Sequence, residues 1–324
     1  MYQKKNFFNA AEALSGIVKQ TPLLWSKNLN EKLGSNLYLK AECLQHTGSF
    51  KLRGAYYSMH REFVESGKRD VVAFSSGNHA QGVALAAKIQ NVKATIVMPG
   101  DAPESKIKNT IALGAEVIFY DRYTESREEI AQSLANKNDA FLIPAYDHKD
   151  VICGQGTVGL ESFHQMAIIG RTVDRFYCPI GGGGLIAGSS SALNLFNPNT
   201  RIIGVEPELL NDTQKSMASG KRESIVIQPN TLCDSLMAQT PGEITFKINQ
   251  SMVSSIDTVT DQQVIESMRI AFDEFEIIVE PGGAASLAAA ISAIKRKEVE
   301  DGESIVVVLR GGNISKERHQ NLIN

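Results

Sequence analysis

Short runs of β-branched and apolar residues alternate with longer amphipathic runs along almost the whole sequence. The short runs have the length of buried strands, whereas the longer runs carry apolar residues at i, i+3 and i+4 spacing, which predicts helices. The predicted strands are 37–39, 71–74, 94–98, 117–119, 141–143, 176–180, 202–205 and 305–309. The clearest predicted helices are 126–135, 158–167 and 262–275. This alternation predicts an α/β fold in which helices cover mostly parallel sheets.

Length and composition exclude several classes of function. The chain has 324 residues, of which 43% are hydrophobic, and its formal net charge is -3 at pH 7. A chain of this size forms one large domain or two medium ones. Because no long Lys/Arg cluster is present, nucleic acid and anionic membranes are not expected as main partners. We therefore expect a small soluble substrate.

Cysteine usage and the N-terminus indicate the compartment. Cys43, Cys153, Cys178 and Cys233 are scattered without a Cys-x-x-Cys pair, which is typical of reduced core thiols rather than a disulfide framework or a zinc site. Residues 1–6 lead into an amphipathic helix pattern instead of a signal-peptide core, and no uncharged apolar run is long enough to span a bilayer. We expect a cytoplasmic protein.

One lysine stands among small and apolar residues. Lys51 lies in the segment TGSFKLRGA at 47–55. A desolvated lysine loses its proton more readily and becomes a nucleophile toward carbonyl compounds. The ordinary alternative is a solvated lysine at a helix start, and this segment alone does not exclude it.

Two turns of small residues follow predicted strands. The segment SSGNH at 75–79 follows the strand at 71–74, and four glycines at 181–184 follow the strand at 176–180. Backbone N–H groups at a helix N-terminus are free to bind anions, and ligands of such folds bind at the carboxyl ends of strands. One reactive lysine and two anion-binding turns indicate a phosphorylated aldehyde cofactor and a carboxylate substrate.

In this order and spacing, the three segments resemble the pyridoxal-phosphate enzymes of the serine/threonine dehydratase and serine racemase family, which have fold type II and are tryptophan synthase β-like. The resemblance extends from QTPLL at 20–24 to GGNI at 311–314, and it is far more specific than one glycine-rich loop. It implies two domains, each a mostly parallel twisted sheet flanked by helices. Residues 1–53 and 148–324 would form the large cofactor-binding domain, and residues 54–147 the small domain.

The resemblance implies that Lys51 forms the Schiff base with pyridoxal 5'-phosphate and removes the α-proton once the substrate releases it. A freed neutral amine beside the Cα–H is well placed for general-base work. Phe50 would flank the cofactor ring. The cofactor phosphate would bind to backbone N–H groups of Gly181, Gly182, Gly183 and Gly184. The alternative for these glycines is a tight turn without a ligand.

The 75–79 segment resembles the loop that grips the substrate carboxylate. The residues concerned are Ser75, Ser76, Gly77, Asn78 and His79, and Asn78 would also lie near the 3'-oxygen of the cofactor. In racemases of the family the serine at the position of Ser76 stands on the face opposite the lysine and protonates a carbanion there. Many dehydratases carry the same serine, so Ser76 permits racemisation without establishing it.

Arg127 matches a family position near the β-substituent of the substrate. It lies in ESRE at 125–128 and could pair with a second substrate carboxylate. A solvent-facing helical arginine between glutamates is an equally good account of the same residue.

Glu206 and Asp212 match the divalent-cation site of the family, in which the backbone carbonyl of Leu210 would join the two carboxylates. Hard oxygen ligands of this kind suit magnesium, calcium or manganese. The alternative is a Glu-Pro turn at a strand end without a metal. A bound ion would hold the two domains in a productive arrangement.

Two positions depart from the family pattern. Arg310 stands where the family usually has a serine or threonine hydrogen-bonded to the pyridine nitrogen. Arginine has donors only and stays charged, so an arginine aimed at this nitrogen would keep it unprotonated and disfavour racemisation more than elimination. The alternative is that the side chain turns away. In Cys233-Asp234-Ser235 a glycine commonly follows the aspartate, so we expect a tighter active-site wall there.

These motifs predict a pyridoxal-phosphate-dependent ammonia-lyase that converts L-threonine, L-serine or 3-hydroxyaspartate to a 2-oxo acid and ammonia. The alternative with the same cofactor is a serine racemase. A nicotinamide-dependent oxidoreductase is disfavoured, because neither glycine segment reads Gly-x-Gly-x-x-Gly with an acidic residue after the next strand. A non-catalytic binding module is the remaining alternative if Arg310 abolishes chemistry. The expected partners are an amino-acid substrate and a second copy of the chain in a homodimer.

Overall fold

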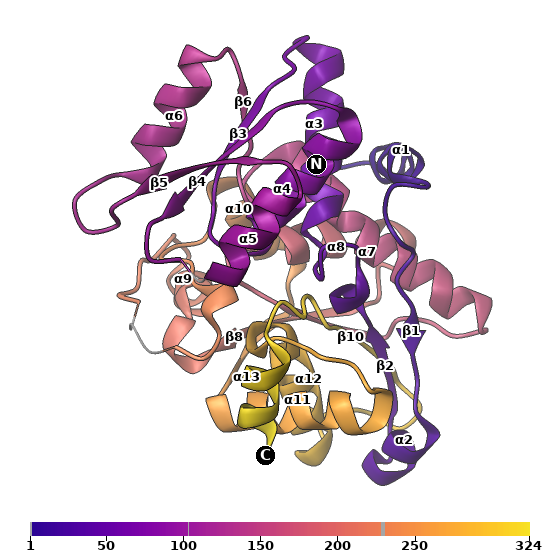
Figure 1. The fold of residues 1–324 in the computed structure, drawn as a ribbon. Coiled ribbons are helices and arrows are strands. Elements are labelled where there is room, and N and C mark those ends of the chain that lie inside the picture. The colour runs from indigo at the N-terminus through magenta and orange to yellow at the C-terminus, as the bar shows by residue number, and fades with distance from the viewer. Residues whose placement is uncertain (1, 103, 228–230) are drawn as a thin grey trace.

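Two largely parallel sheets organise the molecule. The structure, a computed structural model, describes residues 2–102, 104–227 and 231–324. Six strands form one sheet and four form the other, with helices packed on both (Figure 1). The predicted α/β fold with two helix-flanked sheets is confirmed.

The strands, in chain order, are β1 (Leu23–Leu24), β2 (Asn36–Lys40), β3 (Val71–Phe74), β4 (Ala94–Pro99), β5 (Glu116–Tyr120), β6 (Phe141–Leu142), β7 (Arg175–Pro179), β8 (Arg201–Pro207), β9 (Ser255–Val259) and β10 (Ser304–Val308).

The α-helices are α1 (Lys4–Leu14), α2 (Lys27–Leu33), α3 (Lys51–Glu65), α4 (Asn78–Gln90), α5 (Glu104–Ala112), α6 (Arg127–Lys137), α7 (Lys149–Ile168), α8 (Gly184–Phe196), α9 (Asp212–Ser219), α10 (Glu243–Met252), α11 (Asp261–Phe275), α12 (Pro281–Lys295) and α13 (Lys316–Ile323). Three short 3-10 helices are η1 (Glu42–Leu44), η2 (Glu208–Leu210) and η3 (Asp234–Leu236).

The six-stranded sheet joins distant parts of the chain. Its order is β1-β2-β10-β7-β8-β9, and only the β1–β2 pair is antiparallel. All five residues of β10 are buried, as expected for an inner parallel strand covered on both faces. Because β10 lies between β2 and β7, the C-terminal end of the chain lies beside the segment that leads to Lys51.

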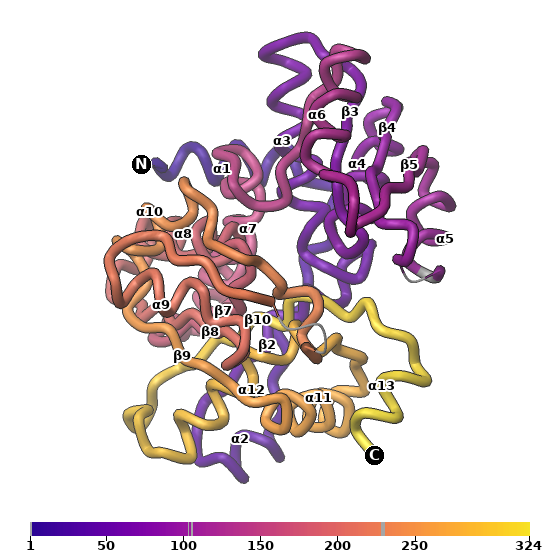
Figure 2. The backbone as a smooth tube through the Cα atoms, turned by 90° about the vertical axis from the view of Figure 1, so that its left-hand side faces the viewer, coloured from indigo at the N-terminus to yellow at the C-terminus, as the bar shows by residue number. Residues whose placement is uncertain are grey.

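The four-stranded sheet comes from one continuous part of the sequence. Its order is β5-β4-β3-β6, all parallel, and its strands lie between residues 71 and 142. Figure 2 shows this sheet with α4 and α6 at one end of the molecule, and α11 and α13 at the other. The sheet falls inside the predicted small domain at 54–147, whose boundaries stay a prediction.

Most predicted elements are present, and the two clearest omissions have physical reasons. Helix α12 reads PGGAASLAAAISAIK and is buried along nearly its whole length, so it has no polar face to reveal a helical period. Strand β9 is a half-buried edge strand with polar residues. No described helix is long and apolar enough to cross a membrane. The four cysteines are buried free thiols.

Helices α7 and α8 pack closely because small residues line their crossing. A Cβ at Gly159 of α7 would lie 2.5 Å from the carbonyl oxygen of Ser189 in α8. Any larger residue would push the two helices apart. This close packing fixes the N-terminus of α8, where the four-glycine turn ends, against α7.

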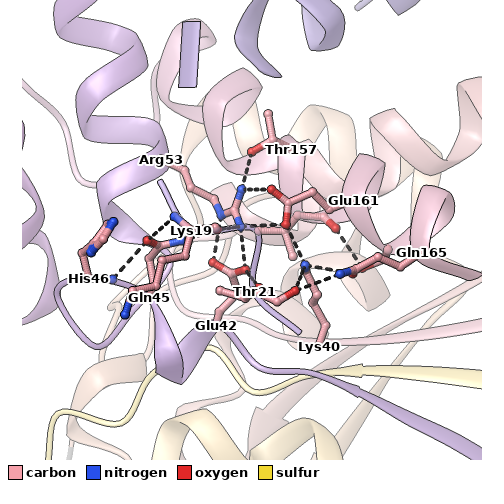
Figure 3. A network of polar contacts seen from close by, with 12 residues as sticks. Lys19, Thr21, Lys40, Glu42, Gln45, His46, Arg53, Thr157, Glu161 and Gln165 are labelled. Carbon is pink, nitrogen blue, oxygen red and sulfur yellow. Dashed lines mark hydrogen bonds and ion pairs between the residues drawn. The ribbon is translucent and has the colours of Figure 1, made fainter. Parts of the chain in front are cut away.

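A buried ion cluster ties the start of α3 to the large sheet (Figure 3). Arg53 lies between two glutamates: its Nη2 is 2.8 Å from Glu42 Oε1, and its Nη1 is 2.6 Å from Glu161 Oε1. Lys40 Nζ lies 2.6 Å from the other oxygen of Glu161. Burial opposes ionisation of Glu42, but the charge and hydrogen bonds of Arg53 lower its pKa overall. Two cations and two carboxylates thus compensate each other in the interior.

We expect Arg53→Ala to lower the free energy of unfolding by about 3–5 kcal/mol, because it leaves buried carboxylates unpaired. Chemical denaturation measures this loss. The matched control is Arg61→Ala on the same helix, since the Arg61–Glu65 pair is about 40% exposed at both ends and should contribute less than about 1 kcal/mol. Equal losses in the two variants would show that the cluster is not the stronger interaction.

Candidate active site

Backbone pairing between two distant segments positions Lys51. The N–H of Phe50 donates to the carbonyl oxygen of Arg310 at 3.3 Å, and Gly312 N–H donates to the Gly48 carbonyl at 2.9 Å. Ser49 and Gly311 form the bridge between these two bonds. Lys51 is then the first residue of α3, and its Nζ donates to the Ala145 carbonyl at 2.5 Å.

The Lys51 amine loses its proton near neutral pH. Burial, followed by the nearby charge of Arg310, lowers its pKa to about 7. Its place in the first turn of a helix acts in the same direction, since the positive end of the helix dipole disfavours an ammonium. Its Nζ lies 5.2 Å from the centroid of the buried Phe50 ring. A neutral amine of this kind is both a nucleophile and a general base.

The 75–79 segment forms the turn between β3 and α4, as predicted. Gly77 N–H donates to Ser75 Oγ at 3.1 Å, and Asn78 begins the helix. Ser76 is half-buried in this turn. His79 Nε2 lies 3.1 Å from the Ile143 carbonyl, and burial, followed by the charge of Lys51, lowers its pKa to about 3. His79 is therefore neutral near pH 7, so an anion at this turn would be bound by backbone N–H groups rather than by a charged imidazole.

A chain of amides and one carboxylate connects this turn to the C-terminal segment. Asn78 Nδ2 donates to Glu280 Oε1 at 2.7 Å, and Asn313 Nδ2 donates to Asn78 Oδ1 at 2.6 Å. Asn313 also donates to the Thr47 carbonyl at 2.8 Å. Glu280 was not predicted as a site residue. Its place immediately before Pro-Gly-Gly at a helix start was the only available signal.

The four-glycine turn forms a cradle that side chains would fill. It precedes α8, and Gly183 has φ +89°, which favours glycine. A Cβ at Gly184 would lie 2.8 Å from Gln155 Oε1, and a Cβ at Gly182 would overlap the Tyr146 ring. Thr245 Oγ1 donates to the Gly182 carbonyl at 2.7 Å. No local pattern predicted the contacts of Gln155, Tyr146 and Thr245 with this turn, because only tertiary packing brings them there.

Arg310 is directed into the same region. It is 5% exposed, and its guanidinium carbon lies 5.5 Å from the centroid of the Phe50 ring. The side chain thus lies against the same ring as Lys51 Nζ, and whether it would point at the pyridine nitrogen or turn away stays a prediction.

Arg127 lies outside this buried group. It begins α6, is about half exposed, and pairs with Glu128 at 2.8 Å. Its guanidinium carbon also lies 5.3 Å from the centroid of the Phe74 ring, at the strand end that leads into the 75–79 turn. The pair with Glu128 agrees with the solvent-facing account, and the contact with Phe74 agrees with the substrate account.

The two predicted metal-ligating carboxylates are buried close together. Burial, followed by the charge of Asp212, raises the pKa of Glu206 to about 8, and burial raises the pKa of Asp212 to about 7. Glu206 accepts hydrogen bonds from two backbone N–H groups, whereas both oxygens of Asp212 lack a partner among the described residues. Leu210 ends η2 between the two. The described residues contain no group of three or more His, Cys, Asp or Glu side chains that could hold a metal.

The Cys233-Asp234-Ser235 segment lies between α5 and α12. Lys106 Nζ of α5 donates to Asp234 Oδ2 at 3.1 Å. A Cβ at Gly282 of α12 would lie 2.5 Å from Ser235 Oγ, which agrees with a close-packed wall.

Comparison with known proteins identifies the family. The family described as "Pyridoxal-phosphate dependent enzyme" matches residues 14–311. L-threo-3-hydroxyaspartate ammonia-lyase of Saccharomyces cerevisiae is 41% identical over 316 residues, 98% of this chain and 94% of that protein. Serine racemase of Schizosaccharomyces pombe is 37% identical over 98% of this chain and 95% of that protein. A threonine deaminase from T.th. has a similar structure, with a TM-score of 0.89, 38% identity, and coverage of 96% of this chain and 98% of that one.

This chain belongs to the family of pyridoxal-phosphate dependent enzymes, in fold type II. The residues present fit the cofactor. A glycine cradle at a helix N-terminus suits its phosphate, and a partly buried lysine with a lowered pKa suits its aldehyde. The Nε–H of Arg310, which has no acceptor among the described residues, is available to its ring.

We expect pyridoxal phosphate to turn the cofactor-free protein yellow, and borohydride reduction followed by peptide mass mapping to place the label on Lys51. The rate of capture should rise with pH up to about 7 and then level off, because the neutral amine is the nucleophile and its pKa is about 7. Lys51→Ala should remain colourless. A label on another lysine would contradict this assignment.

Proposed function

We propose that this enzyme is an ammonia-lyase that converts a small β-hydroxy amino acid to a 2-oxo acid and ammonia. The observation that carries the proposal is the partly buried amine of Lys51, whose pKa is lowered to about 7 and whose charge also lowers the pKa of His79 at the end of the 75–79 turn. The ammonia-lyase relative at 41% identity supports it. The preferred substrate in this proposal is 3-hydroxyaspartate, ahead of L-threonine and L-serine.

Different residues of the chain perform the steps of the elimination. Bound pyridoxal phosphate supplies an aldehyde for the substrate amine and an electron-withdrawing ring. The N–H groups of the 75–79 turn hold the α-carboxylate, and Lys51 Nζ takes the α-proton. The Cβ–O bond then breaks, and the hydroxide takes the proton that Lys51 carries and leaves as water. Hydrolysis of the resulting enamine consumes one water and gives the 2-oxo acid and ammonia.

Arg127 supports a substrate with a second carboxylate. Its contact with Phe74 places a guanidinium next to the strand end that precedes Ser75. Burial raises the pKa of Tyr146, and the charge of Arg127 partly opposes this rise. Arg127 is therefore close enough to act electrostatically on Tyr146, whose ring lies against the glycine cradle. A bidentate pair with carboxylate is the arrangement that guanidinium favours.

We expect Arg127→Ala to lower kcat/KM for 3-hydroxyaspartate about 10- to 100-fold, the loss of one charge-assisted interaction. Activity on L-serine should change less than about 3-fold, since serine has no second carboxylate. The matched control is Arg122→Ala, an exposed arginine that pairs with Asp101. Parallel losses on both substrates would contradict substrate recognition by Arg127.

Serine racemase is the alternative, because racemases are among the relatives and Ser76 lies in the turn. The same assay separates the two reactions when recovered L-serine is analysed for inversion. An enzyme that inverts L-serine faster than it forms pyruvate would overturn the lyase proposal. Loss of inversion but not of elimination in Ser76→Ala would assign Ser76 as the second-face acid.

We further propose that Glu206, Asp212 and the Leu210 carbonyl bind magnesium, calcium or manganese. The support is the pair of buried carboxylates and the two unpartnered oxygens of Asp212, since a cation would offset their repulsion.

We expect chelation to lower the thermal stability, and each of these ions to restore it. An ion at one hundred times its Kd stabilises by about 2.7 kcal/mol through mass action. Glu206→Gln and Asp212→Asn should abolish the response to metal. The control is Glu208→Gln, a change in an exposed carboxylate two residues away. A response that persists in the first two variants would exclude this site.

We also propose a cytoplasmic homodimer. The free buried thiols suit a reducing compartment, and exposed Trp25, Ile168 and Ile169 line one apolar groove that a second copy could cover. Sedimentation of the purified protein tests the assembly.

A further inference from the structure

Helix α10 holds the carbonyl groups of the glycine turn. Thr245 Oγ1 donates to the Gly182 carbonyl at 2.7 Å, and the Gly242 N–H donates to the same oxygen at 3.4 Å. Asn249 Nδ2 donates to the Gly183 carbonyl at 3.5 Å. Two successive peptide groups of the turn are therefore bonded through their oxygens to one helix.

These bonds fix the direction of the N–H groups in the same peptide units. A peptide group is planar and trans, so its C=O and N–H point to opposite sides. Because α10 holds the Gly182 carbonyl, the N–H of Gly183 points away from α10. The bond to the Gly183 carbonyl directs the N–H of Gly184 in the same way. Both donors lie at the N-terminus of α8, where the first N–H groups have no intrahelical acceptor and suit an anion.

The contact between α10 and the turn is direct. A Cβ at Gly183 would lie 2.8 Å from Asn249 Nδ2 and 3.1 Å from Thr245 Oγ1. The side chains of Thr245 and Asn249 are fully buried. Glycine at this position is therefore required by the close approach of α10 as well as by the positive φ. A displacement of α10 would move the turn with it.

Asp147 fixes the start of α10. Gly242, at the N-cap, has no side chain with which to cap the helix. The two oxygens of Asp147 accept instead from the N–H groups of Glu243 at 2.8 Å, Ile244 at 2.9 Å and Thr245 at 3.0 Å. A carboxylate at a helix N-terminus both satisfies these donors and complements the helix dipole. The cap holds Thr245 itself, because one of the three bonds is to its backbone.

The capping residue belongs to a segment, 145–147, that also contacts the lysine. The carbonyl of Ala145 accepts from Lys51 Nζ at 2.5 Å, and the ring of Tyr146 lies against Gly182. Three consecutive residues thus contact the lysine, the glycine turn and α10. The position of α10 is therefore set relative to both ends of the site.

We propose that Thr245 is a positioning residue for the phosphate of pyridoxal phosphate: its hydroxyl holds the Gly182 peptide so that the Gly183 N–H faces the phosphate. Thr245 does not touch the phosphate, but it sets the direction of a donor that does. A hydrogen bond weakens steeply as the donor turns away from the line to its acceptor. This inference rests on the glycine turn as the phosphate site, and it holds for whichever reaction the enzyme performs.

The test compares the binding of pyridoxal phosphate with that of pyridoxal, which has no phosphate, to the cofactor-stripped protein. Absorbance titration gives the Kd of each. Thr245→Val keeps the shape of the side chain but removes the hydroxyl. We expect it to raise the Kd for pyridoxal phosphate about 5- to 20-fold and the Kd for pyridoxal less than about twofold. Thr245→Ser keeps the hydroxyl and should stay within about threefold of the parent for both ligands.

Phosphorus NMR of the bound cofactor gives a second readout. The phosphate resonance should shift in Thr245→Val and keep its parent position in Thr245→Ser. The matched control is Thr110→Val, because Thr110 is an equally buried threonine whose hydroxyl donates to the Lys106 carbonyl at 2.9 Å in α5. Its replacement should change neither the Kd values nor the resonance.

Equal losses for the two ligands in Thr245→Val, or an unchanged Kd for pyridoxal phosphate, would overturn the role of Thr245. A parent protein that binds pyridoxal phosphate no more tightly than pyridoxal would overturn the phosphate site itself. Failure of the parent to form a 2-oxo acid would overturn the proposed lyase function instead and leave the binding result standing. If Thr245→Val does not fold, Thr245→Ala, which removes the same hydroxyl, decides by the same comparison.

Discussion

The structure depends on whether the positive charges in its interior are compensated by nearby carboxylates. Removing a charge from water costs several kcal/mol unless partners replace the lost solvation. Lys40 and Arg53 meet this condition through Glu42 and Glu161, and their cluster holds the start of α3 against β2 and α7. Lys51, two residues before Arg53, pairs with no carboxylate among the described residues, so its amine gives up its proton near neutral pH. The compensated cations stabilise the fold, and the proposed reaction depends on the lowered pKa of Lys51.

Parallel topology sets the positions of the two turns that are proposed to bind ligands. The 75–79 turn follows β3 of the small sheet, and the glycine turn follows β7 of the large sheet. Both are at carboxyl ends of strands, where helix N-termini present free N–H groups. The Asn78–Glu280 hydrogen bond and the Lys106–Asp234 pair connect the two sheets across the site. Relative movement of the sheets would therefore change the site directly.

Local sequence was sufficient for most strands and for the turns at their ends. The apolar runs that form β3, β4 and β7 have the length and composition of buried strands. Four consecutive glycines at 181–184 are typical of a turn that another group approaches closely. Helix α12 was missed because it is buried on all sides, and strand β9 was missed because it is a half-buried edge strand. Neither element shows the regular alternation of apolar and polar residues on which such predictions depend. Glu280, Gln155 and Tyr146 were missed because nothing near them in the chain indicates what they contact.

The sequence by itself determined the α/β class, the lysine, the two turns and the family to which they belong, since each depends on residues that are neighbours in the chain. Only the tertiary structure decided the packing of Arg310, the lowered pKa of Lys51 and the compensation of Arg53. These properties depend on burial and on charges contributed by segments up to 260 residues apart, as the Phe50–Arg310 hydrogen bond shows. Desolvation is a property of the whole packed interior, and no local pattern of residues records it.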